Sequence, residues 1–62
     1  MTTHSLSITD WRHAIDCAIA TVESDERFYA LLYILSEVKS VEPFLGTEAV
    51  TLPEKQQRII FG

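Results

Sequence analysis

Apolar residues recur every three or four positions in the first part of the chain, a spacing that places them on one face of a helix. This face comprises Ile8, Trp11, Ile15, Ala18, Ile19 and Val22. Ser7 precedes Asp10 by three residues, which is the capping-box pattern that satisfies free backbone N–H groups at a helix start. The pattern predicts an amphipathic helix over about residues 8–23, and we expect residues 1–6 to be flexible.

The apolar pattern changes phase after Val22, and this change predicts a second helix. The next stripe begins at Phe28, six positions later rather than seven, which rotates the apolar face by about 100°. A chain break at Ser24 resolves the mismatch, because serine is a good helix cap. Pro43 disfavours helical geometry at the residue before it, so we expect the second helix over about residues 25–42. A single long, bent helix is the alternative to this helical hairpin.

Two structures compete for the C-terminal part of the chain. Residues 51–54 read Thr-Leu-Pro-Glu, a typical helix start with a threonine cap and a proline in the first turn. They predict a short helix over about residues 52–61. The alternative is a β-hairpin between residues 49–52 and 58–61, which are both rich in strand-forming side chains. We favour the helix, so the expected fold is a single all-α domain.

The second helix carries apolar residues on more than one face. The expected core of the hairpin comprises Trp11, Ile15, Ala18, Val22, Phe28, Leu31, Leu32, Leu35 and Val38. A surface helix normally has an apolar stripe only somewhat wider than 100°, and this helix exceeds it. The expected partner interface comprises Tyr29, Tyr33, Ile34, Val41 and Phe44. Tyrosine suits interfaces because it combines a large apolar body with a polar tip.

The length of the chain supports a need for a partner. A chain of 62 residues is near the lower limit for independent folding. Small domains are often stabilised by disulfides, metals or oligomerisation, and Cys17 is the sole cysteine, so no disulfide forms within the chain. We therefore expect a homodimer or a complex with another protein, although the C-terminal segment could instead cover the second helix.

Charge and hydropathy exclude several partners. Nine acidic and five basic residues give a net charge of −4, which disfavours binding to nucleic acid phosphates. The longest apolar run covers residues 28–35, whereas a membrane-spanning helix needs about 20 residues. A lone cysteine and an N-terminus without a signal peptide lead us to expect a cytoplasmic protein that does not bind membranes.

The sequence contains few groups that could carry out chemistry. Asp10, His13 and Cys17 fall on one side of the first helix and could each bind zinc, but a structural site needs four ligands. Cys17 as a nucleophile would need a base and an oxyanion hole, and only His13 could approach it. We therefore expect no enzyme activity, no metal and no cofactor.

Three functions fit these observations. The leading hypothesis is a small interaction module, an adaptor or an inhibitor, that binds a larger protein through an apolar and aromatic helix face. The second is a transcriptional regulator or antitoxin-like DNA-binding protein that uses Lys55 and Arg58. The third is a structural small subunit of a larger complex. The sequence identifies neither the partner nor the process.

Overall fold

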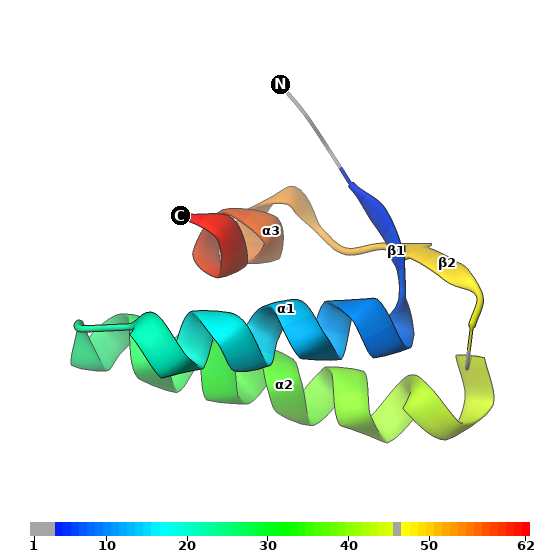
Figure 1. Ribbon diagram of the computed structural model, residues 1–62, viewed down its shortest axis with the longest axis horizontal. Coiled ribbons are helices and arrows are strands. Elements are labelled where there is room, and N and C mark those ends of the chain that lie inside the picture. The colour runs from blue at the N-terminus through cyan, green and yellow to red at the C-terminus, as the bar shows by residue number, and fades with distance from the viewer. Residues whose placement is uncertain (1–3, 46) are drawn as a thin grey trace.

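The computed structural model describes residues 4–45 and 47–62, which form three helices and one small sheet (Figure 1). The elements follow the order β1 (Ser5–Ser7), α1 (Ile8–Thr21), α2 (Asp25–Leu45), β2 (Ala49–Thr51) and α3 (Glu54–Phe61). Helices α1 and α2 lie side by side as a hairpin, and α3 contacts both of them. The protein is therefore mainly helical, as expected, but the two strands depart from an all-α fold.

The predicted break between the first two helices is confirmed. The Ser7 hydroxyl accepts a hydrogen bond from the backbone N–H of Asp10 at 3.1 Å, so α1 begins where the capping pattern placed it. Helix α1 ends at Thr21, and the Ser24 hydroxyl accepts a hydrogen bond from the N–H of Arg27 at 3.4 Å. The single bent helix is therefore wrong, because the chain leaves the helical conformation between α1 and α2.

Helix α2 continues past the predicted end and includes Pro43 in its last turn. The expectation that it stops at residue 42 is wrong. Proline lacks a backbone N–H, but near the end of a helix this removes only one of the last helical hydrogen bonds. Val41 and Leu45 both pack against the core, and this burial favours the additional turn.

The N-terminal segment forms strand β1, although residues 1–6 were expected to be flexible; residues 1–3 lie outside the described part of the chain. Strand β1 pairs antiparallel with β2, and Leu6 lies opposite Val50. The hydroxyl oxygens of Ser5 and Thr51 are 2.5 Å apart at one end of the pair. The sequence did not predict β1 because a strand of three residues is too short to show a periodic pattern. Its partner strand, β2, also lies more than 40 positions away in the chain.

Helix α3 confirms the helical prediction for the C-terminal part, and the β-hairpin alternative is wrong. The helix begins at Glu54 rather than at residue 52, and its N-cap is Pro53 rather than Thr51, which belongs to β2. Residues 49–51 do form a strand, but β2 pairs with β1 rather than with residues 58–61. The Arg27 guanidinium donates to the carbonyl oxygens of Ile59 at 2.9 Å and Ile60 at 3.2 Å, at the C-terminal end of α3. These bonds satisfy carbonyls that the helix leaves unpaired and hold α3 against α2.

The buried side chain of Gln57 ties α3 to the N-terminal segment. Its amide oxygen accepts the backbone N–H of His4 at 2.9 Å, and its amide nitrogen donates to the carbonyl oxygen of Leu52 at 2.9 Å. A buried amide needs such partners, since an unpaired polar group in a core costs about 1–3 kcal/mol.

The core lies where the three helices meet. Its buried apolar side chains are Ile8, Trp11, Ile15, Ala18, Leu31, Ile34, Val38 and Ile60. Trp11 is fully buried, its indole N–H donates to the carbonyl oxygen of Val50 at 2.7 Å, and its ring lies 5.7 Å from that of Phe61. The core therefore includes α3, and the two strands are attached to it through Trp11.

Helix α2 is rotated about its axis relative to the prediction. Ile34, placed by the sequence pattern at a partner interface, is only 2% exposed, whereas Leu32, placed in the core, is 39% exposed. Phe28 and Leu35, also expected in the core, are half-buried. Apolar residues surround the first half of α2, so several rotations bury a similar area, and the pattern alone could not choose among them.

Val22, the remaining expected core residue, is half-buried because it follows the end of α1 and lies at the rim of the core.

The rotation of α2 predicts unequal effects of truncating Ile34 and Leu32. We expect Ile34→Ala to lower the free energy of unfolding by about 2–5 kcal/mol, because it leaves a cavity in the core. Leu32→Ala removes a partly solvated side chain outside the buried core, and we expect a loss below about 1 kcal/mol. Urea denaturation followed by circular dichroism measures both. The reverse ranking would contradict the rotation of α2.

The indole hydrogen bond predicts a local effect on the sheet. Trp11→Phe leaves the Val50 carbonyl without its donor, and we expect a loss of about 1–3 kcal/mol together with faster amide exchange in β2. Ile15→Val is the matched control, because it removes core volume at a cost of about 0.5–1.5 kcal/mol without affecting that hydrogen bond. Equal exchange rates in β2 for the two variants would show that the bond does not hold the strand.

Candidate protein-interaction surface

One uncharged, largely apolar stripe runs along the side of α2 that faces away from the core. We call it the outer face of α2, and it comprises Tyr29, Leu32, Tyr33, Ser36, Ser40, Pro43 and Phe44, all of them exposed. These positions recur at spacings of three and four and lie half a turn away from the buried stripe of Leu31, Ile34 and Val38. Helix α2 therefore has two apolar faces on opposite sides.

The aromatic side chains of the outer face are strongly exposed. Tyr29 is 68% exposed, Tyr33 is 67% exposed and Phe44 is 85% exposed. At 1.5 Å per residue the face extends about 22 Å along the helix, and with aromatic side chains of roughly 150–250 Å² each it offers on the order of 600 Å². Ser36 and Ser40 interrupt the apolar part of the face. Exposed apolar patches of a few hundred Å² often mark interaction sites, and a standard interface buries about 800 Å² per partner.

The structure retains only part of the predicted interface. Tyr29, Tyr33 and Phe44 lie on the outer face, whereas Ile34 is buried and Val41 is half-buried against the core. Both belong to the inward side because the core stripe of α2 is centred on Leu31, Ile34 and Val38. Sequence reasoning missed Leu32, Ser36, Ser40 and Pro43, which a stripe in phase with Tyr29 and Tyr33 would have included.

Acidic side chains border one flank of the outer face and its N-terminal end. Glu26 precedes Tyr29 by three residues and Glu37 follows Tyr33 by four, so both carboxylates lie on the same flank of the face. Glu23 and Asp25 are exposed beside the first turn of α2. The acidic tip, meaning Glu23, Asp25 and Glu26, makes no ion pair with the rest of the described chain. Asp25 and Glu26 lie at the positive end of the α2 dipole, and Glu26 lines a hollow together with Arg27 and Arg58, so this end of the face is acidic but has positive charge nearby.

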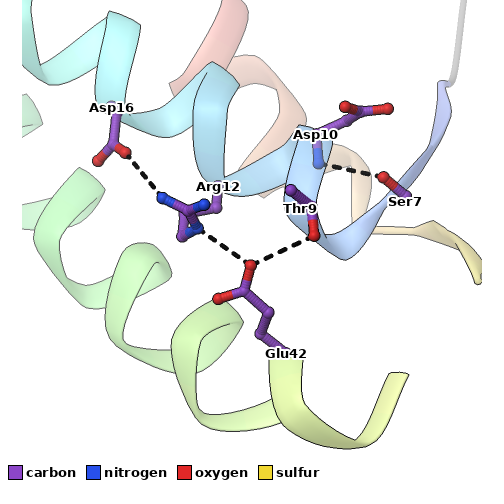
Figure 2. A network of polar contacts seen from close by, with 6 residues as sticks. All are labelled: Ser7, Thr9, Asp10, Arg12, Asp16 and Glu42. Carbon is purple, nitrogen blue, oxygen red and sulfur yellow. Dashed lines mark hydrogen bonds and ion pairs between the residues drawn. The ribbon is translucent and has the colours of Figure 1, made fainter. Parts of the chain in front are cut away.

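A polar network joins α1 to the C-terminal half of α2 (Figure 2). The Glu42 carboxylate accepts hydrogen bonds from Arg12 Nε at 3.0 Å and from the Thr9 hydroxyl at 3.3 Å. The guanidinium of Arg12 also lies 3.6 Å from the Asp16 carboxylate. The side chains of Arg12 and Glu42 are each 29% exposed, so solvent screens this pair less than it would a surface pair. The network joins α1 to α2 two residues before Phe44.

An open hollow of about 490 Å³ lies near the C-terminal end of α3, lined by Ser24, Glu26, Arg27, Arg58, Ile59 and Gly62. The Arg27 guanidinium in this hollow already donates to backbone carbonyls of α3. The hollow is wide open to solvent and lacks the enclosed apolar walls of a small-molecule site.

The other candidate chemical groups are dispersed on the surface. His13 and Cys17 are both exposed on α1. Across residues 4–45 and 47–62, no three His, Cys, Asp or Glu side chains are grouped closely enough to hold a metal ion. Lys55 and Arg58 are exposed on α3, and the Arg58 guanidinium lies 2.9 Å from the Glu54 carboxylate.

Comparisons of this chain with protein-family models, with curated proteins and with solved structures found no match. None of the described helices is both long enough and apolar enough to cross a membrane. The outer face of α2 is therefore the feature of the molecule that bears most directly on function.

The half-buried ion pair of Arg12 and Glu42 predicts a measurable coupling between α1 and α2. In a double-mutant cycle of Arg12→Ala and Glu42→Ala, we expect a coupling energy of about 0.5–1 kcal/mol that falls at high salt. The Glu54–Arg58 pair on α3 is the control, because it is more exposed and should couple by about 0.3–0.5 kcal/mol. A coupling of zero between Arg12 and Glu42 would show that the network does not hold the hairpin.

Proposed function

We propose that this protein acts by binding another protein chain through the outer face of α2. The observation that carries the proposal is the exposure of Tyr29, Tyr33 and Phe44, at 67–85%, on one uncharged side of a helix whose opposite side is already buried. Aromatic side chains are enriched at interfaces and contribute much of the binding energy there.

The physical basis of binding is burial of these side chains on a helix that is already ordered. Covering a large apolar side chain contributes about 1.5–3 kcal/mol, so the three aromatic residues could supply most of the energy of a moderate complex. Helix α2 is held by the core on its inner side, so little backbone entropy is lost when a partner docks. A rigid aromatic face of this kind suits an adaptor, an inhibitor or a small subunit of a complex. These three roles use the same binding surface and differ in the effect that binding has on the partner.

DNA binding is less well supported as a function. The chain carries a net charge of −4, and the basic side chain of Arg58 lies beside Glu54 on α3. Phosphate binding requires several cationic side chains facing the backbone together, and Lys55 and Arg58 provide only two.

Photo-crosslinking in the native cells tests the proposal. With benzoylphenylalanine in place of Tyr33 or Phe44, we expect a discrete crosslinked product, because these side chains would lie against the partner. The same residue in place of His13 or Cys17, exposed on α1, should give at least fivefold less product. Mass spectrometry of the product identifies the crosslinked chain.

Two further results decide the outcome. Adding Tyr29→Ser to the variant labelled at position 44 should lower crosslinking without lowering helix content, since Tyr29 is largely solvated. Equal products from α1 and α2 positions, or no product from the α2 positions, would mean that the outer face is not the binding surface.

A further inference from the structure

We infer that the partner segment is an amphipathic helix with basic residues beside its apolar stripe. This inference rests on the proposed function and specifies the class of partner that the outer face of α2 would bind. It follows from the shape of the face, from the charges on its flanks and from the way in which a second copy would have to pack.

The shape of the outer face favours a helical partner. The backbone N–H and carbonyl groups inside α2 are paired within the helix, so an extended strand would find none to bond with. A helix satisfies its own backbone and needs only side-chain packing. Ser36 and Ser40 occupy the middle of the face between Tyr33 and Phe44, and their small size lets a second helix approach closely.

The charges beside the face favour basic residues on that helix. Glu26 and Glu37 lie on one flank, and the acidic tip adds Glu23 and Asp25 at the N-terminal end of α2. The Glu37 carboxylate also accepts a long hydrogen bond from the Gln56 side chain at 3.5 Å and remains exposed. Lysine or arginine residues of the partner would pair with these carboxylates, and an arginine could also stack on Tyr29. Lys39 alone borders the opposite flank among the basic residues, so the border of the face is predominantly acidic.

The same charges oppose a second copy of this chain as the occupant. In an antiparallel dimer with a two-fold axis, corresponding flanks face each other, so Glu37 of one copy lies near Glu37 of the other. In a parallel dimer the two acidic tips meet instead. The parallel arrangement also places Glu37 of one copy near Lys39 of the other, but each arrangement brings one set of like charges together, which lowers the affinity and disfavours the contact.

A pair of synthetic peptides tests the inference. The first is an 18-residue amphipathic helix with leucine on one face and lysine on the other positions, and the second carries glutamate in place of every lysine. We expect the leucine–lysine peptide to bind the intact protein at least tenfold more tightly than its counterpart in fluorescence anisotropy. The affinity should fall several-fold between 50 and 300 mM salt, because screening weakens the charge pairs.

Charge variants of the protein show whether binding uses the proposed flank. Glu26→Gln with Glu37→Gln should weaken binding of the leucine–lysine peptide by at least fivefold. Asp10→Asn with Glu48→Gln removes the same charge at exposed positions on other elements and should change the affinity less than twofold. Equal effects of the two double variants, or equal binding of the two peptides, would overturn the inference of a basic partner.

Tyr33→Ala separates failure of this inference from failure of the proposed function. If crosslinking in cells depends on Tyr33 but peptide binding ignores the charge variants, the docking face stands and the basic partner is wrong. If Tyr33→Ala changes neither crosslinking nor peptide affinity, the docking face itself is wrong. A wild-type dimer in light scattering that Tyr33→Ala dissociates would assign the face to a second copy and overturn the inference.

Discussion

The position of α3 and of both strands depends on the burial of Trp11. Its ring fills the centre of the core, and its indole N–H can be buried only because the Val50 carbonyl accepts it at 2.7 Å. That bond brings β2 against α1, and β2 in turn pairs with β1. Phe61 packs on the same ring from α3. A single side chain of α1 therefore gathers segments from both ends of the chain.

This arrangement determines which side of α2 stays uncovered. Because α3 is held against Trp11 and by the Arg27 hydrogen bonds, Ile60 joins the core on the inner side of the hairpin. The C-terminal segment thus covers the side of α2 that carries Ile34 and Val38. The C-terminal segment does not cover Tyr29 and Tyr33, since both side chains remain about two-thirds exposed.

The sequence predicted those features that short-range chemistry determines. Ser7 and Ser24 mark the starts of α1 and α2 through bonds to residues three positions away, so local pattern was sufficient. Strand β1 depends on pairing with distant residues, and no local pattern encodes that pairing. The exchange of Ile34 and Leu32 between core and surface has a different cause, because the apolar residues of α2 allow several rotations of nearly equal burial.

The ambiguity in α2 is itself informative about function. A helix that serves only its own core has one apolar side, and its rotation can be read from the sequence, as for α1. Helix α2 cannot be oriented in this way because aromatic side chains occupy the side that the fold leaves in water. Solvent-facing positions on a folded domain tolerate polar residues at almost no cost in stability, so folding alone does not require Tyr29, Tyr33 or Phe44 there. A second protein surface, as we propose, would supply the burial that the fold does not.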